Sequence, residues 1–454
     1  MTDPLLRNVK LFYAFRIFFH ARFYYPVFAV LFLDFGLTTD QFVLLNTVWA
    51  VTIVVLEVPS GALADTIGRT TLLRLASALM VVEMLLILLA PPGETTIVFW
   101  MFFANRIVSG AAEALASGAD EALAYDSLAA AHEKRRWAVV LERCMKYQSA
   151  AFMIAMIAGG LLYDADQINS WLAQLNPGSK LPESLVLTLP VIATFLMACG
   201  ACIATAMMVE PGGHYEQENN SDIEAKNAGD AWKRVLSAGK KILTTPVLFL
   251  IILTGLLHDS IIRMLLTLGS EYYRLIQIEE KYFGFIGAGM AMAGIFLPML
   301  ARIGAKYLPP PVNFSVVALI TFISFCGITL AIPIHGLWFV LLMMSGFSLL
   351  NYFISYYLNR HAESSQRATI LSFRGLAYNM GYGLLGLAYA GYLGYLKEGE
   401  TLAKPDFAFA ESLKVFPVVF LAAMVFLVLV ALVLARKCPK GCPDDRDTSP
   451  SEAN

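Results

Sequence analysis

The chain has 454 residues, of which 58% are hydrophobic and only 15% are charged. Soluble domains typically carry about 25% charged residues, so this composition argues against a soluble globular protein. The formal net charge of −2 gives no overall attraction to nucleic acid, and we expect no nucleic-acid partner.

The apolar residues come in runs of about 20, the length that a helix needs to cross about 30 Å of hydrocarbon. Because lipid offers the backbone no hydrogen-bond partners, such runs predict membrane-spanning helices. We expect twelve, at about 10–33, 42–64, 72–90, 97–125, 138–162, 186–209, 246–272, 282–303, 312–332, 336–358, 368–395 and 413–435. The predicted fold class is an all-α integral membrane protein.

The runs divide as six, a hydrophilic stretch, then six. We expect a six-helix bundle over residues 1–209, a linker over 210–241, a second bundle over 242–437, and a disordered tail over 438–454. The tail contains the close pair Cys438 and Cys442, which is at most half of a metal site with no second half in the chain. We therefore expect no metal and no cofactor.

Lys and Arg are distributed unevenly over the connections between these runs. Alternate connections, starting with the N-terminus, are rich in them. The opposite set holds only Lys180, Arg274, Lys281, Lys397, Lys404 and Lys414. By the positive-inside rule, both termini and the linker are cytoplasmic. We expect a multi-pass protein of a bacterial inner membrane.

The two halves carry matching sequence features. Arg136 and Arg143 enter the fifth run, and Arg367 and Arg374 enter the eleventh with the same seven-residue spacing. Both runs then become rich in small residues, which let helices pack closely in lipid. Pseudo-symmetric halves of six helices are a transporter architecture.

The connection between the second and third runs reads Gly61-Ala-Leu-Ala-Asp65-Thr-Ile-Gly68-Arg69. It resembles the signature loop of the major facilitator superfamily, although Thr66 stands where that family usually has a base. The resemblance implies a gate at the cytoplasmic end that locks the two halves together. The expected gate residues are Gly61, Asp65, Gly68, Arg69 and, as the partner of Arg69, Asp126. Alternatively, Asp65 only caps a helix or turn.

The fourth run holds Arg106, Gly110 and Glu113, similar to the pattern of the fourth helix in that family, where the arginine is associated with proton coupling. Seven residues apart, Arg106 and Glu113 share a helix face. We expect Glu113, and Asp259 in the second half, to be the proton-coupling carboxylates. The alternative is a structural Arg106–Glu113 ion pair. The fifth run lacks the Gly-Pro of the drug-antiporter signature.

The resemblance also implies a central cavity lined by helices 1, 4, 7 and 10. On the first helix, Arg16, His20 and Tyr24 lie four residues apart on one face, and Arg22 points elsewhere. We interpret Glu57 and Glu83 as structural. The expected substrate-binding residues are Arg16, His20, Tyr24, Arg106, His258, Asp259, Arg263, Asn351 and Tyr378.

The expected function is a secondary active transporter, a symporter or antiporter, that moves a small organic solute by alternating access. We expect a monomer in the lipid bilayer with protons as coupling ion. Three intramembrane arginines favour an anionic or zwitterionic metabolite or an exported compound. A transport-inactive receptor or scaffold of the same fold is the alternative. A membrane enzyme is less favoured, because the six histidines form no catalytic motif.

Overall fold

The computed structural model describes residues 4–211, 232–233, 237, 239–240, 242–361, 367–398 and 405–437. Inside its helices, the description leaves out the side chains of residues 62, 65, 66, 138, 293–295, 359, 367–369, 371–372, 398, 405–406 and 436–437. The side chain of Asp65, most of the expected linker and the tail with Cys438 and Cys442 therefore lie outside the described residues.

Residues 4–211, here called the N half, form six spans. The spans and their adjoining short helices are α1 (Pro4–His20) with η1 (Tyr25–Val27) and α2 (Phe28–Asp34), α3 (Thr39–Ile67), α4 (Arg69–Leu88), α5 (Thr95–Ala116) with α6 (Ala119–Ala130), η2 (Lys134–Arg136) with α7 (Trp137–Tyr163), and α9 (Glu183–Val186) with α10 (Leu189–Ala206). A further helix, α8 (Ala165–Leu175), lies between α7 and α9.

Residues 242–437, here called the C half, repeat this order. The helices are α12 (Pro246–Thr267) with α13 (Gly269–Leu275), η3 (Glu280–Tyr282) with α14 (Phe283–Tyr307), α15 (Pro310–Thr329), α16 (Gly336–His361), α17 (Arg367–Glu398), and α18 (Pro405–Ser412) with α19 (Val415–Lys437).

The predicted all-helical architecture is confirmed. Among the described residues, eleven stretches are long and apolar enough to cross a membrane, which agrees roughly with the twelve expected. The remaining one is α17, a 32-residue helix whose tyrosines, glycines and charged residues lower its mean hydropathy. Because α17 packs along α3 and α12, only part of its surface needs to be apolar.

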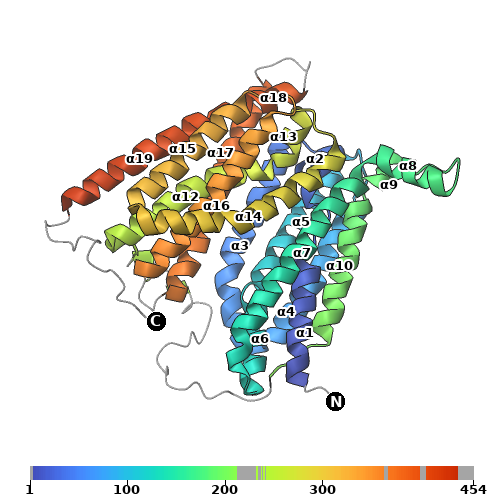
Figure 1. Cartoon of the computed structure of the whole chain (residues 1–454). Helices are drawn as coiled ribbons and strands as arrows, with labels where there is room; N and C mark the ends of the chain where they lie inside the picture. The colour runs from blue at the N-terminus through green and yellow to red at the C-terminus, as the bar shows by residue number, and fades with distance from the viewer. Residues whose placement is uncertain are drawn as a thin grey trace.

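Two ends of the bundle are distinguished here by their residues (Figure 1). The Arg69 end holds the start of α1, the α3–α4 connection and the end of α6. The Asp34 end holds α2, α13 and the α3 N-terminus. The helices of the two halves meet at the Asp34 end and draw apart toward the Arg69 end.

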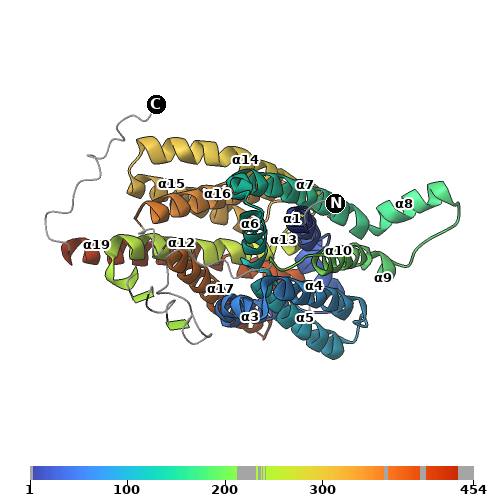
Figure 2. The same cartoon turned by 90° about the horizontal axis from the view of Figure 1, so that it is seen from below.

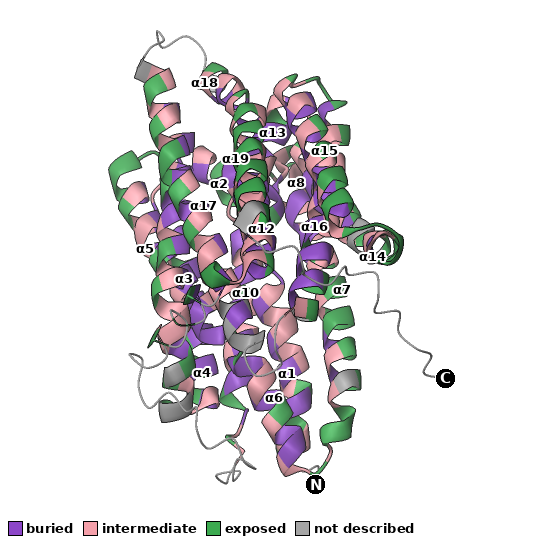
Figure 3. Ribbon diagram, turned by 90° about the vertical axis from the view of Figure 1, so that its left-hand side faces the viewer, coloured by how far each residue is buried: buried purple, intermediate pink, exposed green. Residues whose placement is uncertain are grey.

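The buried apolar side chains show the same asymmetry. At the Asp34 end, one cluster runs through both halves and joins Phe32 and Phe102 to Leu268, Tyr272 and Phe283. Toward the Arg69 end, the clusters are separate: two lie within the N half and a third lies within the C half. Figure 3 shows buried residues along the inside of the molecule, while exposed ones cover its outer helices. Among the residues that the structure describes, the halves thus share a buried apolar core at the Asp34 end alone.

The first span is broken. Helix α1 ends at His20, and regular helix resumes only at η1 and α2. In the break, the backbone N–H of Phe23 donates to Thr194 Oγ1 at 2.9 Å. Its carbonyl lies against Gly159 of α7 so closely that a Cβ there would stand 1.7 Å from the oxygen. Only glycine fits at this position. The expected common face for Arg16, His20 and Tyr24 is wrong, because the helix ends before Tyr24.

The two halves touch along α3 with α17 and along α7 with α14 (Figure 2). On the second seam, a Cβ at Gly284 would lie 2.0 Å from the Met156 carbonyl oxygen, and one at Gly160 would lie 2.8 Å from the Gly284 nitrogen. Glycines on both helices therefore allow backbone contact between the halves near the Asp34 end.

We predict that Gly284→Ala disfavours this arrangement, because overpacking typically costs about 1–3 kcal/mol. Spin labels at the exposed positions Leu89 and Leu330, one in each half at the Asp34 end, should move apart. Gly289→Ala is the matched control, since a Cβ there meets nothing within 4 Å. Equal label distances in the two variants would contradict the steric argument.

Candidate functional site

A group of charged and polar side chains lies inside the N half around Glu83 of α4. We call Arg22, Tyr24, Glu83, Asn105 and Arg106 the Glu83 cluster. Glu83 Oε1 is 2.6 Å from Arg22 Nη1, 3.2 Å from the Tyr24 hydroxyl that donates to it, and 3.7 Å from Arg106 Nη2. The Glu83 side chain is fully buried, and its Oε2 has no hydrogen-bond partner in the described part of the chain. One carboxylate thus serves two guanidinium groups.

Asn105 holds the cluster together. Its Nδ2 donates to the backbone carbonyl of Glu83 at 2.6 Å, and its Oδ1 accepts from Arg106 Nη2 at 2.8 Å. The Arg106 guanidinium also lies 5.3 Å and 5.4 Å from the ring centres of Phe28 and Phe32. Such cation–π contacts help to stabilise a charge that has left water.

Glu113 stands at the accessible edge of this cluster. Its side chain is 41% exposed, and Oε2 lies 4.0 Å from Arg22 Nη2. The alternative reading, a structural Arg106–Glu113 ion pair, is wrong in this conformation, because Arg106 turns to Asn105 and Glu83 instead. A charged side chain at membrane depth is costly in lipid and typically faces the bundle interior or a water-filled space.

The other residues expected to bind substrate from the first helix have different neighbours. Arg16 pairs with Asp120 and Glu121 of α6 at 2.5 Å each. His20, half-buried, is the last residue of α1, with its ring against that of Phe19. Tyr24, by contrast, is buried inside the Glu83 cluster.

The C half holds a smaller charged group on α12 and α17. Arg263 Nε donates to Asp259 Oδ2 at 3.0 Å, and Arg263 Nη1 donates to Asn379 Oδ1 at 2.7 Å. The guanidinium also lies 5.0 Å from the ring centre of Tyr382. Arg263 therefore spends its donors on the protein itself.

His258 and Tyr378 lie away from an accessible surface. The His258 ring is buried against Phe420, with Nδ1 2.8 Å from the Thr254 carbonyl oxygen. Tyr378 is buried over Gly255, where a Cβ would meet its hydroxyl at 1.6 Å. Both are packed side chains in this conformation rather than residues open to a solute.

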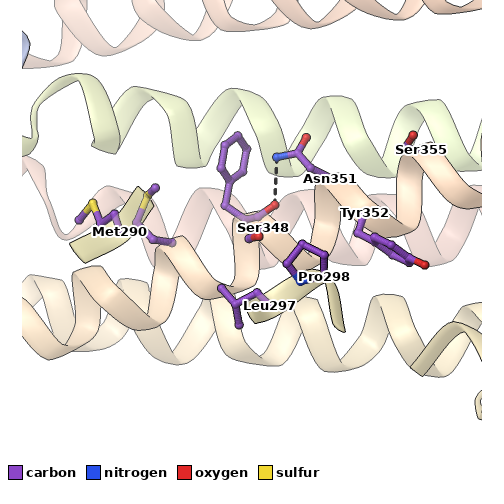
Figure 4. Close-up of a pocket in the computed structure, with 9 residues that line it drawn as sticks. Met290, Leu297, Pro298, Ser348, Asn351, Tyr352 and Ser355 are labelled. Atoms are coloured by element: carbon purple, nitrogen blue, oxygen red, sulfur yellow. Dashed lines mark hydrogen bonds between the residues drawn. The ribbon is translucent and has the colours of Figure 1, made fainter. Parts of the chain in front are cut away.

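A pocket of about 480 Å³ lies between α14 and α16 (Figure 4). Its polar lining comes from one helix, α16, with Ser348, Asn351, Tyr352 and Ser355, while Met290, Leu297, Pro298, Met344 and Phe347 supply the apolar walls. Asn351, an expected binding residue, donates from Nδ2 to the Phe347 carbonyl at 3.0 Å. None of the nine lining residues is Asp, Glu, His, Lys or Arg. The pocket has a size that suits a small organic molecule.

Polar links between the halves gather at the Asp34 end. Arg274 of α13 makes a two-pronged pair with Asp34, both N···O distances being 2.8 Å, and Tyr163 donates to the same carboxylate at 2.7 Å. Thr39 donates to Glu271 Oε1 at 2.6 Å. Partial burial lowers the pKa of Arg274, but hydrogen bonds from its guanidinium to Asp34 and Glu280 outweigh that effect and raise the pKa above its ordinary value. The guanidinium stays charged at any physiological pH.

A further link at this end joins one half's backbone to the other half's side chain. Ser270 Oγ accepts the backbone N–H groups of Ala29 and Val30 at 2.9 and 3.2 Å. These amides belong to the first turn of α2, which has no side-chain cap of its own. Ser270 therefore caps α2 from across the interface.

At the Arg69 end, the expected gate residues occupy different settings. Gly61 lies within α3, and nothing is within 4 Å of a Cβ built on it. Gly68 makes the turn, with φ of +88°, a conformation that favours glycine. Arg69 pairs with Asp126 of α6, both in the N half. The loop is also held by Glu210, whose Oε2 accepts the Thr70 N–H at 2.9 Å.

Sequence reasoning named Arg22 and Glu83 but did not predict that they pair, and it did not consider Ser270 and Glu210. Glu83 carried a usable signal: an acidic residue in the middle of an apolar run usually has a partner and a role. The partners of Ser270 and Glu210 lie 241 and 140 residues away along the chain, and no local pattern indicates such contacts.

Comparisons with known proteins agree with this architecture. The family model described as Major Facilitator Superfamily matches residues 11–384. A bacterial homologue of the human lysosomal transporter Spinster, solved in an inward-facing and unoccupied conformation, is similar over 97% of this chain and 98% of its own, with a TM-score of 0.65 and 15% identity.

Two further solved structures are similar. The nucleoside transporter NupG covers 96% of this chain and 99% of its own, with a TM-score of 0.67 and 11% identity. A D-xylose-proton symporter covers 94% and 97%, with a TM-score of 0.65 and 12% identity. No curated protein matches the sequence significantly. At these identities, the solved structures carry the fold alone.

The Glu83 cluster makes a prediction about stability. Glu83→Gln removes the carboxylate shared by Arg22 and Arg106, and uncompensated buried charge typically costs about 3–5 kcal/mol. We expect a large fall in thermal unfolding temperature in detergent. Glu113→Gln is the matched control: its carboxylate is 41% exposed and 4.0 Å from its nearest guanidinium, so we expect only a small change. Equal unfolding temperatures for both variants would contradict the prediction.

Proposed function

The chain belongs to the Major Facilitator Superfamily, and we propose that it is a secondary transporter that moves a small organic solute by alternating access. The observation that carries this is the one-sided interface: the halves share a core and polar links at the Asp34 end, whereas their cores are separate at the Arg69 end. A transporter of this kind exposes its site to one side at a time.

We propose that the Arg69 end is cytoplasmic, because the basic residues gather there. The conformation is then inward-facing, with the Asp34 end as the closed external gate. In the outward-facing state, we propose that Asp65 and Arg69 hold the cytoplasmic end closed. Arg69 already pairs with Asp126 here, so closing that end does not require this pair to form anew.

The pairing of the arginines narrows the proposed substrate. The membrane-depth guanidinium groups of Arg16, Arg22, Arg106 and Arg263 each have a carboxylate or amide partner within the protein. An anionic solute would have to displace one of these partners. The pocket between α14 and α16, by contrast, offers hydroxyl and amide groups among apolar walls. These features favour an uncharged or cationic organic solute over the anion expected from the arginines alone.

Two of the similar structures, by their own names, carry a nucleoside and D-xylose, both uncharged and polar. We propose the same broad class here, with Asn351 and Ser348 as hydrogen-bonding groups. The residues of the Glu83 cluster and Asp259 then hold the cavity walls rather than the solute.

For coupling, we propose that Glu113 carries the proton. Its carboxylate is accessible, and Arg22 stands 4.0 Å away while bound to Glu83 at 2.6 Å. An ionised Glu113 competes with Glu83 for Arg22, whereas a protonated one leaves the Arg22–Glu83 pair undisturbed. Protonation of Glu113 thereby changes the charge balance of the cavity wall.

The external gate makes one prediction. Ser270→Ala removes the cap of α2, and loss of an N-cap typically costs about 1 kcal/mol, or roughly a fivefold change in an equilibrium. We expect the ratio of closed to open molecules at the Asp34 end to fall by about that factor, read from spin labels at Leu89 and Leu330. Ser345→Ala is the control, because that hydroxyl bonds only within its own helix, to the Leu341 carbonyl. An unchanged distance distribution would remove Ser270 from the gate.

Transport itself is tested with Glu113→Gln in proteoliposomes. A thermal-shift screen of uncharged and cationic metabolites first identifies a ligand. We expect the variant to lose uphill uptake driven by a pH gradient while keeping counterflow exchange of that ligand. Glu142→Gln is the control, an exposed carboxylate paired with Lys146.

Loss of exchange together with a lower unfolding temperature would assign Glu113 a structural role. Absence of any flux in the unaltered protein, despite ligand binding, would favour a transport-inactive receptor of the same fold.

A further inference from the structure

Helix α8 stands outside the membrane-spanning bundle. It begins at Ala165, immediately after Asp164 and the end of α7 at Tyr163. Asp164 caps it by accepting the Gln167 N–H at 2.8 Å. Both overall views show α8 extending sideways from the bundle at the Asp34 end (Figures 1 and 2). It therefore starts at the membrane surface and runs along it.

The sequence of α8 is sharply two-sided. One face, at the spacing of successive helical turns, carries Ala165, Ile168, Trp171, Leu172 and Leu175, and the other carries Asp166, Gln167, Asn169, Ser170 and Gln174. The apolar face is open toward its outer end, where Leu175 is 85% exposed and Trp171 is 41% exposed, while Ala165, Ile168 and Leu172 are half-buried. No residue of α8 is buried.

The helix nevertheless belongs to a built hairpin. Asn169, on the polar face, accepts the Leu181 N–H at 2.8 Å and so fastens the returning chain. The return leads through α9 into α10, a membrane span. Both ends of the hairpin are thus tied to membrane-spanning helices, and its apolar face is exposed at Trp171 and Leu175 beside them.

We propose that α8 is an interfacial helix whose apolar face lies in the lipid leaflet at the Asp34 end. The argument is continuity: α8 follows a membrane span after a single residue, so its apolar face continues the lipid-contacting surface. An amphipathic helix with a Trp on its apolar side typically lies about 5–10 Å into the boundary between headgroups and acyl chains. Its partner is the bilayer itself, independently of any transported solute.

The charges of the hairpin specify the kind of lipid contact. From Asp164 to Glu183 there are three carboxylates, Asp164, Asp166 and Glu183, against one lysine, Lys180. This excess of negative charge gives no attraction to anionic headgroups. The contact is therefore driven by apolar burial, and high salt leaves it unchanged.

The test places an environment-sensitive fluorophore on either face of α8, at Leu172→Cys or Ser170→Cys. Both use the full chain with its other cysteines replaced by serine, reconstituted at one copy per lipid nanodisc. Nitroxide-labelled lipid should quench the Leu172→Cys probe several-fold more than the Ser170→Cys probe, and aqueous iodide should do the reverse. The ratio should be the same in zwitterionic and anionic lipid and at low and high salt.

Equal iodide quenching at both positions would overturn the proposal. So would protection that appears only with two copies per disc, which would assign the face to a second chain. Hydrogen exchange provides a check without labels, by comparing the unaltered protein with a double variant. The amides of α8 should exchange faster in the double variant Trp171→Asp with Leu175→Asp, and unchanged exchange would also overturn the proposal.

Discussion

A backbone amide inside hydrocarbon needs a hydrogen-bond partner, and the break in the first span leaves several of them without a helical one. The Phe23 N–H goes to Thr194 in the same half, but those of Ala29 and Val30 go to Ser270 in the other half. The N half therefore completes its own first span only by touching α13. This ties secondary structure to the relative position of the halves, because separating them at the Asp34 end uncovers these amides. If that end faces water, as we propose, water can replace Ser270 in the open state at modest cost.

The buried charged groups of the N half likewise have partners within the protein. Arg22 and Arg106 share the Glu83 carboxylate and add an amide and two aromatic rings, so no guanidinium in the cluster is left without a partner. Pairing of this kind fixes the position of the side chains but does not by itself stabilise a protein more than apolar packing would. Its cost is reasonable where a nearby group changes its charge during function. Glu113, at the edge of the cluster, is the described acidic group within 4.0 Å of Arg22 that remains accessible.

Hydropathy predicted the helical fold and nearly every span, because burial in lipid demands a run of apolar residues whatever the tertiary contacts. Hydropathy indicates α17 least strongly, because α3 covers part of that helix and the covered positions need not be apolar. The break after His20 was not predicted, as Arg22 and Tyr24 continue a helical periodicity that the Gly159–Phe23 contact overrides. The expected contact between Arg69 and Asp126 is present, with both residues in the N half. Helix-face geometry alone suggested a pair of Arg106 and Glu113, but Arg106 bonds to Asn105 beside it and lies 3.7 Å from Glu83 of α4.

In the proposed function, coupling at Glu113 and gating at the Asp34 end are connected through the broken first span, which contains Arg22 and α2. Arg22 lies in the break, two residues from Tyr24, and the same break leads into α2, which carries Asp34 and the amides capped by Ser270. If an ionised Glu113 draws Arg22 away from Glu83, the backbone around Arg22 is pulled with it. The contacts of Phe23 with Gly159 and Thr194 hold the backbone on the other side of the break, so the strain has to pass along the chain. The shortest route for that adjustment is along η1 into α2, whose other end is fixed to Arg274. Protonation of Glu113 keeps Arg22 on Glu83 and leaves α2 seated on the C half, so the protonated protein is expected to favour the conformation closed at the Asp34 end.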